Sequence, residues 1–82
     1  MEVSETIRTI ISMQTGVPPQ ELSASMDFRM LPEIDSMRLL QIVLETENAF
    51  GIEIPDYVTF HIQSIGEYEE LVGQLRRQGS PA

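Results

Sequence analysis

The chain has 82 residues, 41% of them hydrophobic, and its 13 acidic and five basic residues give a net charge of −8. This length and composition support one small domain with its own core, and exclude a disordered tail. Because the chain has no cysteine, disulfides and thiolate metal sites are excluded, and the strong negative charge disfavours binding to nucleic acid or to anionic membranes.

Apolar residues at helical spacing predict a first helix from about Glu2 to Thr15. Gly16 is placed to end it in a left-handed conformation, and Pro18 and Pro19 prevent its continuation. The same amino-terminal stretch lacks the features of a secretory signal and is too acidic for a transit peptide. No apolar run approaches the length of a membrane span. We therefore expect a cytoplasmic protein that does not associate with membranes.

A long connection follows the first helix. It contains proline, serine and glycine, but apolar residues recur along it: Val17, Leu22, Met26, Phe28, Leu31 and Ile34. These side chains are expected to hold the connection against the core. An ordered loop of this length in so small a domain is usually functional.

A central helix is predicted from Ser36 to about Phe50, with Asp35 as its N-cap and Gly51 as its terminator. The residues expected on its buried face are Met37, Leu40, Val43, Leu44 and Phe50, with Leu39 and Ile42 widening that face. After it, Ile52 and Ile54 are expected in an extended loop that buries both side chains. Residues 56–62 are expected to form a short helical turn.

The last helix begins at a capping box made by Ser64 and Glu67, and Arg76 and Arg77 suit the dipole at its carboxyl end. Its expected buried stripe consists of Ile65, Tyr68, Leu71, Val72 and Leu75. The predicted fold is all-α: a four-helix bundle of three main helices and a short third helix, with a long loop after the first. Residues 77–82 are expected to form a frayed tail after a single domain at 1–76.

Little in the sequence supports catalysis. His61 has no second histidine, cysteine or suitably spaced carboxylate with which to hold a metal. Ser36, His61 and Asp35 do not make a credible triad, because Asp35 adjoins the serine and cannot readily orient a distant imidazole. The glycines are isolated, and the acidic residues lack the spacing of a calcium loop. We expect no enzymatic activity.

Ser36 is the residue that needs an explanation. An Asp-Ser pair at a helix start is ordinarily a cap, but a serine there can also be a point of attachment. Three motifs occur in order along the chain: Asp35-Ser36-Met37, the segment FGIEIPD at 50–56, and Ser64-Ile65 at the start of the last helix. Together they resemble the acyl carrier protein family over about Val3 to Leu75, without gaps from Asp35 onward.

The resemblance implies that 1–76 is a carrier domain and that a phosphopantetheinyl transferase attaches 4′-phosphopantetheine, taken from coenzyme A, to Ser36, beside Asp35. Acyl intermediates would then travel as thioesters on this arm, in a specialised polyketide, mixed or fatty-acid-like pathway served by a freestanding, monomeric carrier. Two alternatives stay open. One is a freestanding aminoacyl or aryl carrier with the same arm, and the other is an unmodified acidic helical domain that binds a protein partner.

The resemblance also implies a surface that docks acyl-activating, condensing or acyltransferase enzymes through their basic patches. In this chain the corresponding residues are Met37, Arg38, Gln41, Glu45, Glu47, Glu53 and Asp56. Arg38 and the neutral Gln41 depart from the family's acidic pattern. Arg38 could therefore reject housekeeping partners, or it could simply pair with a neighbouring carboxylate.

Two further points follow from the resemblance. An acyl chain would enter between the second and third helices, near Leu39, Leu44, Val58 and Ile62. Glu33 stands where the family usually has glycine, two residues before the aspartate, so the turn into the central helix is expected to be built differently.

Overall fold

Four α-helices make up the described part of the chain, residues 3–61 and 63–78 of a computed structural model, and no β-strand occurs there. The helices are α1 (Val3–Thr15), α2 (Ser36–Phe50), α3 (Asp56–His61) and α4 (Ile65–Arg77), with two short 3₁₀ turns, η1 (Pro19–Glu21) and η2 (Phe28–Met30), in the connection after α1. The predicted all-α architecture with a short third helix is confirmed.

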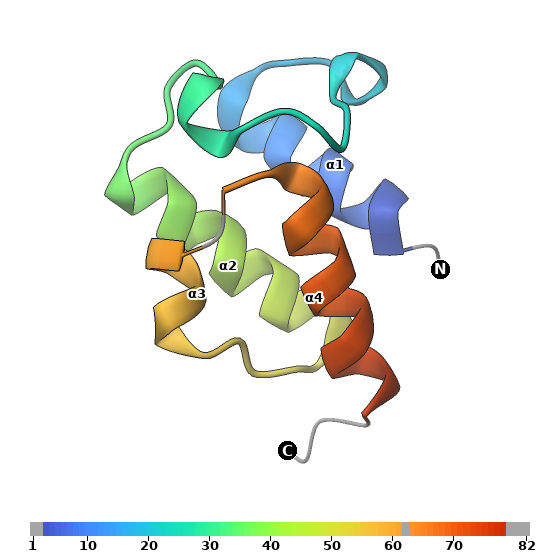
Figure 1. Cartoon of the computed structure of the whole chain (residues 1–82). Helices are drawn as coiled ribbons and strands as arrows, with labels where there is room; N and C mark the ends of the chain where they lie inside the picture. The colour runs from blue at the N-terminus through green and yellow to red at the C-terminus, as the bar shows by residue number, and fades with distance from the viewer. Residues whose placement is uncertain (1–2, 62, 79–82) are drawn as a thin grey trace.

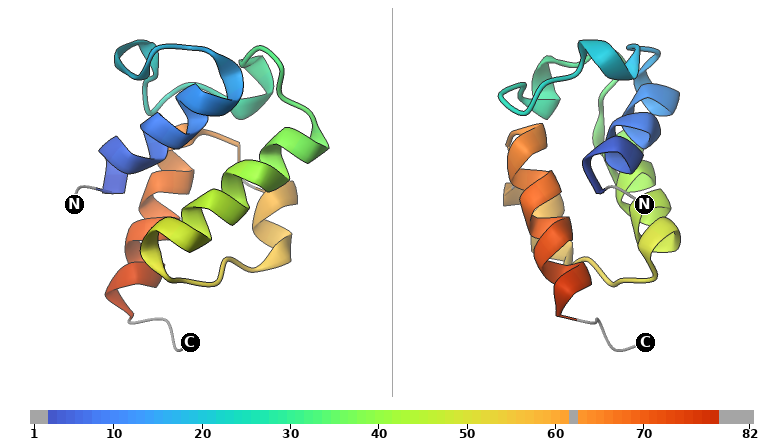
Figure 2. Two further views of the ribbon diagram at one scale, coloured as in Figure 1. Left: turned by 180° about the vertical axis from the view of Figure 1, so that it is seen from behind. Right: turned by 90° about the vertical axis from the view of Figure 1, so that its right-hand side faces the viewer.

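The helices form two layers. Helices α1 and α2 cross in one layer, and α4 with the short α3 lies in the other (Figure 2). The connection between α1 and α2 passes over one end of the bundle, while the loop between α2 and α3 closes the opposite end (Figure 1). The start of α2 therefore lies beside the long loop.

The core draws on every helix and on the long loop. Its buried apolar residues are Ile7, Ile10, Ile11, Leu22, Phe28, Leu31, Ile42, Val43, Ile52, Ile54, Val58, Ile65, Tyr68 and Val72. The loop residues Leu22, Phe28 and Leu31 are among them, which confirms that apolar side chains hold this loop to the core. Ile52 and Ile54 lie in the segment without regular secondary structure after α2, and both side chains are buried, as predicted.

Backbone hydrogen bonds fasten the long loop to the start of α4. The amide of Phe28 donates to the carbonyl of Gln63 at 2.9 Å, and the amide of Gly66 donates to the carbonyl of Ala24 at 2.9 Å. A Cβ atom at Gly66 would lie 2.9 Å from both the Cβ and the carbonyl oxygen of Ala24. The loop and helix can approach this closely only because residue 66 has no side chain.

The predicted ends of the helices agree well with the structure. Gly16 and Gly51 take positive φ values of 80° and 65° after α1 and α2. The Ser64 hydroxyl accepts from the amide of Glu67 at 3.1 Å, and the Glu67 carboxylate accepts from the amide of Ser64 at 3.0 Å, so the capping box is present. Helix α4 includes Arg77, and residues 79–82 of the expected tail lie outside the described residues.

The buried face of α2 was predicted only in part: Ile42 and Val43 are buried as expected, and Leu39 and Phe50 pack against the core. Met37, Leu40 and Leu44 are 79%, 50% and 44% exposed, whereas the buried residues of the helix are Ile42, Val43 and Thr46. Two adjacent stripes of α2 are apolar enough to face a core. The stripe that is buried includes Thr46, whose hydroxyl accepts from the Tyr68 hydroxyl of α4 in the interior.

Candidate functional site

Ser36 is the first residue of α2 and is exposed at the end of the bundle crossed by the long loop. The side-chain cap of this helix comes from Asp35, whose Oδ1 accepts from the amide of Arg38 at 2.8 Å. Asp35 has the extended backbone (φ −142°) typical of an N-cap. The cap is thus supplied without the Ser36 hydroxyl, which is left at the surface beside the helix amino terminus.

The turn that leads into α2 contains a left-handed residue. Glu33 has φ 66° and is the non-glycine residue with positive φ in the described part of the chain. A side chain in this conformation costs roughly 1 kcal/mol, because its Cβ crowds the following carbonyl. This turn sets the direction in which the chain enters α2, and its strain lies three residues from Ser36.

The environment of Ser36 suits a phosphodiester. The first turn of an α-helix carries unpaired amide groups and the positive end of the helix dipole, both of which favour an anion. No acidic residue lies in the first turn of α2, and Met37, the next residue, is 79% exposed. The site therefore combines an accessible hydroxyl, the positive end of the helix dipole and an apolar neighbour, next to the Asp35 carboxylate that occupies the Arg38 amide.

Arg38 makes a contact that sequence reasoning did not anticipate. Its Nη1 donates to the carbonyl oxygen of Gln14 at 2.9 Å, in the last turn of α1. A cation there is favourable because the carboxyl end of a helix is the negative end of its dipole. Arg38 thus ties the start of α2 to the end of α1 through a backbone carbonyl.

The other predicted docking residues divide into two groups. Glu45 is half-buried and accepts from Nε2 of Gln14 at 2.6 Å and from Nε2 of Gln41 at 3.3 Å. Glu47 is also half-buried, and its Oε2 accepts from the amide of Ile54 at 2.7 Å. These two carboxylates stabilise the fold, so their charges are only partly available to a partner.

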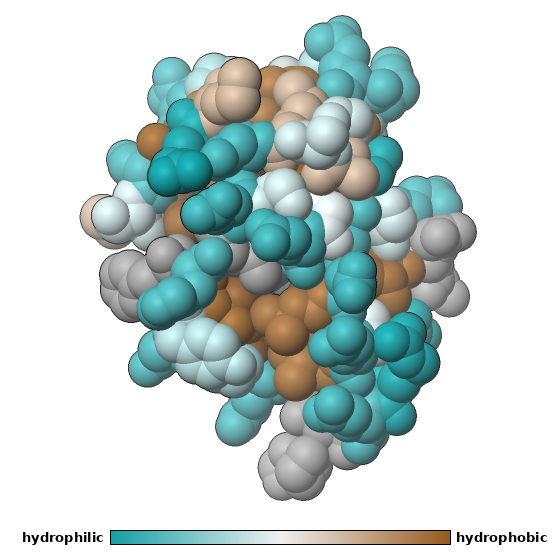
Figure 3. All heavy atoms as spheres, viewed as in Figure 1, coloured by the Kyte–Doolittle hydropathy of each residue, from teal (hydrophilic) through white to brown (hydrophobic). Residues whose placement is uncertain are grey.

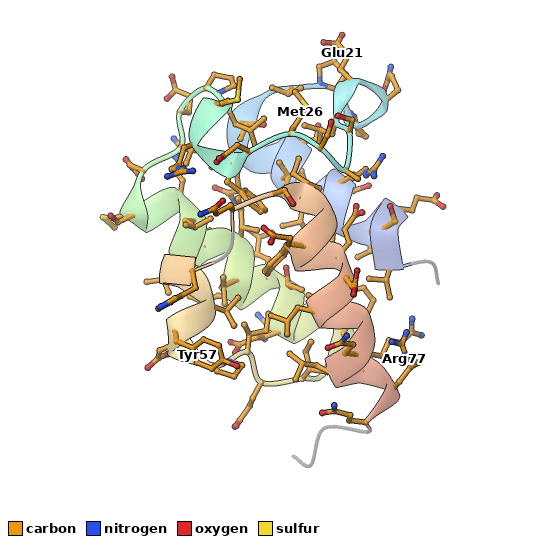
Figure 4. All side chains as sticks on the ribbon, viewed as in Figure 1. Glu21, Met26, Tyr57 and Arg77 are labelled. Atoms are coloured by element: carbon orange, nitrogen blue, oxygen red, sulfur yellow. The ribbon has the colours of Figure 1, made fainter. Side chains whose placement is uncertain are left out.

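The second group is exposed and consists of Met37, Gln41, Glu53 and Asp56. Asp56 opens α3, whose exposed Tyr57 lies at the end of the bundle away from Met26 and Glu21 of the long loop (Figure 4). The exposed acidic residues of the predicted docking surface therefore lie around the loop between α2 and α3.

The residues predicted to contact an acyl chain differ in how far they are exposed. Val58 is 2% exposed and belongs to the core, Leu39 is half-buried against it, and Leu44 is 44% exposed. Ile62 lies outside the described residues. The space-filling view shows hydrophobic residues at the surface between α3 and α4 (Figure 3). An apolar surface patch thus lies beside α3.

A buried polar pair between α2 and α4 was missed in the sequence. The Tyr68 hydroxyl donates to Oγ1 of Thr46 at 2.9 Å, and Thr46 donates to the carbonyl of Ile42 at 2.7 Å. Burial raises the pKa of Tyr68 to about 12, so the phenol stays neutral at physiological pH. The available signal was Thr46 itself, a polar residue at helical spacing from Ile42 and Phe50.

Other chemistry finds little support in the described residues. His61 is exposed, and its Nδ1 lies 2.8 Å from the carbonyl of Tyr57 in the preceding turn. Within residues 3–61 and 63–78 no group of three histidine or acidic side chains is arranged to hold a metal ion. None of the helices described there is long and apolar enough to span a membrane.

Comparison with known proteins gives the class of this fold and site. The family model described as "Phosphopantetheine attachment site" matches residues 5–78, which is nearly the whole chain, and makes it a phosphopantetheine-attachment domain. An acyl carrier protein of Rubrobacter xylanophilus is 34% identical over 71 residues, covering 87% of this chain and 88% of that protein.

Two further relatives cover 99% of this chain. They are an acyl carrier protein of Rhodococcus erythropolis, 25% identical with 89% of its length covered, and a meromycolate extension acyl carrier protein of Mycobacterium tuberculosis (strain ATCC 25618 / H37Rv), 27% identical with 70% covered. The chain belongs to the acyl carrier protein family. Membership indicates a carrier role, with a phosphopantetheinyl transferase and biosynthetic enzymes as interaction partners.

Proposed function

We propose that this protein carries acyl groups as thioesters on a 4′-phosphopantetheine arm attached to Ser36. The assignment rests on one observation at the start of α2: Asp35 caps the helix, so the adjacent serine is exposed and not needed as a cap. A serine needed as a cap could not accept a bulky group without loss of that bond.

The attachment step uses coenzyme A as donor and a phosphopantetheinyl transferase as catalyst. The Ser36 oxygen attacks the phosphate next to pantetheine and loses its proton to a base of the transferase. A new P–O bond forms as the pyrophosphate linkage breaks, and adenosine 3′,5′-bisphosphate leaves. The phosphodiester then lies at the amino terminus of α2, where the helix dipole favours its negative charge.

The cargo chemistry is performed by partner enzymes, and the carrier itself supplies no catalytic group. Its contribution is to keep a tethered substrate at high effective concentration near each partner. We place the protein in the cytoplasm, where coenzyme A is available. Partners with basic patches would meet the exposed Met37, Gln41, Glu53 and Asp56, of which Gln41 also donates to Glu45. Glu45 and Glu47 contribute less because they are half-buried and bonded within the fold, and Arg38 is bonded to the Gln14 carbonyl.

A specialised lipid pathway fits the protein best. Several relatives are named meromycolate extension acyl carrier proteins, and one of them is 27% identical over 81 residues. A tethered chain would lie along the face shared by α2 and α3, near Leu39, Leu44, Val58 and Ile62. The half-buried and exposed leucines of α2 there offer an apolar surface.

The test is the intact mass of the protein after incubation with coenzyme A and a permissive transferase. We expect a gain of one phosphopantetheine group in the wild type and in Ser25→Ala, an exposed loop serine that serves as the matched control. Ser36→Ala should gain nothing. A folded wild type that gains no mass with several transferases, or a Ser36→Ala variant that does gain it, would overturn the assignment.

A further inference from the structure

Tyr68 spans the interior of the bundle from one helix layer to the other. It projects from α4, is 2% exposed, and its hydroxyl reaches Oγ1 of Thr46 on α2 at 2.9 Å. Thr46 is 0% exposed, and its hydroxyl donates a hydrogen bond to the carbonyl of Ile42 at 2.7 Å. The Tyr68 hydroxyl therefore has its partner only while the two layers stay together, whereas the bond donated by Thr46 lies within α2.

A second ring completes this arrangement. Phe28, from the long loop, is 2% exposed and stands edge-on to Tyr68, with ring centroids 5.6 Å apart and planes at 89°. Edge-to-face pairs of this kind are favourable beyond the area they bury. Tyr68 and Phe28 are also among the largest fully buried side chains. The space between α2, α4 and the long loop is thus occupied by two aromatic rings and a hydroxyl pair.

The hydrogen bonds of Tyr68 and Thr46 make it unfavourable for another group to displace these side chains from the interior. Within the described residues, no buried side-chain nitrogen or oxygen lacks a partner. An apolar chain entering between α2 and α4 would have to move the tyrosine ring and separate its hydroxyl from Thr46. The chain could not replace the lost bond, and leaving a buried polar group unpaired is unfavourable.

The hollow between α1 and α2 does not offer an apolar chain another way in. Its walls include the apolar Ile10 and Ala49 as well as Glu5, Thr9 and Glu45, and none of the residues of the aromatic and hydroxyl group lines it. An alkyl chain in this hollow would lie beside two carboxylates, which is unfavourable, and it would not reach Tyr68.

We propose that Tyr68, Thr46 and Phe28 close the centre of the bundle, so that cargo on the Ser36 arm stays at the surface. This inference rests on the proposed carrier function and deepens it, because it says where the cargo lies and that its size is not limited by a cavity. Groups too polar or too long to be enclosed by a small bundle are accepted as readily as short ones. Contacts with Leu39 and Leu44 then occur along the outside of α2, and a partner enzyme need not extract the cargo from a core.

The experiment compares acetyl-loaded and octanoyl-loaded protein, after intact mass has shown the arm and acyl group on Ser36. Amide NMR spectra and melting temperatures are recorded for the wild type, Tyr68→Ala and Tyr68→Phe, with Tyr57→Ala as the matched control on the surface of α3. Free octanoyl-pantetheine is titrated into the unloaded proteins in parallel, so that the interior is tested even if Ser36 accepts no arm.

In the wild type and in Tyr57→Ala, replacing acetyl with octanoyl should leave the core amides near Phe28, Thr46 and Val72 unshifted and the melting temperature unchanged. Tyr68→Ala should show octanoyl-dependent shifts at those amides and a rise in melting temperature, because a ligand that binds the folded state stabilises it. Tyr68→Phe keeps the ring, and Thr46 keeps its bond to Ile42, so this better-folded variant should show at most small core shifts.

Octanoyl-dependent shifts of the wild-type core would overturn the proposal, as would a folded Tyr68→Ala that admits neither tethered nor free octanoyl groups. If Tyr68→Ala does not fold, the wild-type and Tyr68→Phe spectra still show whether octanoyl groups enter the core. A wild type that gains no arm would contradict the carrier function instead. The titration with free octanoyl-pantetheine would then test separately whether an octanoyl group can enter the core.

Discussion

The two glycines of α4 provide a matched pair for testing how the long loop is held. In Gly66→Ala the new Cβ would lie 2.9 Å from the Cβ and 2.9 Å from the carbonyl oxygen of Ala24. Both separations are well below the roughly 3.5–4.0 Å at which such atoms attract. In Gly73→Ala the nearest atom is Nη1 of Arg77 at 3.4 Å, the end of a flexible side chain.

The magnitudes follow from opposing effects. Overpacking costs about 1–3 kcal/mol, and moving Ala24 also weakens the hydrogen bond from the Gly66 amide, worth roughly 1 kcal/mol. Replacing glycine by alanine inside a helix returns roughly 1 kcal/mol. We therefore expect Gly66→Ala to lower the free energy of unfolding by about 1–3 kcal/mol and Gly73→Ala to raise it by about 0.5–1 kcal/mol.

Urea denaturation followed by circular dichroism measures both changes. In a domain of this size, each kcal/mol corresponds to a shift in melting temperature of about 4–8 °C. Adding Ala24→Gly to Gly66→Ala removes the contact between the two Cβ atoms but not the one with the carbonyl, so it should restore part of the stability. If both glycine variants proved equally stabilising, the close packing of the long loop on α4 would be refuted.

Three further predictions concern the turn into α2, its cap and the capping box of α4. Glu33→Gly should raise the free energy of unfolding by about 0.5–1 kcal/mol because glycine adopts φ 66° without strain. The control in urea denaturation is Glu5→Gly, in the first turn of α1, which should not stabilise the protein. A loss of stability in Glu33→Gly would show that the backbone at Glu33 is not strained. Asp35→Ala should cost about 1 kcal/mol while Asp35→Asn retains most of the stability, since both Asp and Asn cap well; equal losses in the two variants would show that capping is not the role of Asp35. Hydrogen bonds from the amides of Ser64 and Gln63 lower the pKa of Glu67 below its ordinary value of 4.5, so its contribution to stability is present above that pH and is lost as the pH falls through the lower folded-state pKa. Unfolding measured from pH 7 downward should therefore show a weaker acid dependence in Glu67→Gln than in the wild type, and identical curves would refute the linkage.

The ends of the helices could be predicted from the sequence because their determinants are local. Asp35 caps an amide three residues away, Ser64 and Glu67 bond to each other across the same spacing, and Gly16 and Gly51 supply left-handed conformations where a helix stops. Each of these interactions needs only residues that are neighbours in the chain.

Only part of the face that α2 buries could be predicted in this way. Met37, Leu40 and Leu44 are as apolar as the residues that the helix buries, and periodicity alone does not choose between adjacent stripes. The buried stripe includes Thr46, whose bond to Tyr68 joins residues that are 22 apart in the chain. The contact of Arg38 with the Gln14 carbonyl, 24 residues away, is non-local in the same sense.

One local and one non-local contact explain how Ser36 is presented. The start of α2 is held by the Asp35 cap within the helix and by the Arg38 bond to the end of α1. The proposed attachment point of the arm is therefore held by two contacts that do not involve the serine. If the interior is closed by Tyr68 and Thr46 as proposed, a rigid anchor is what such a carrier requires, because the position of its cargo then depends on the arm and on the partner enzyme rather than on a cavity in the bundle.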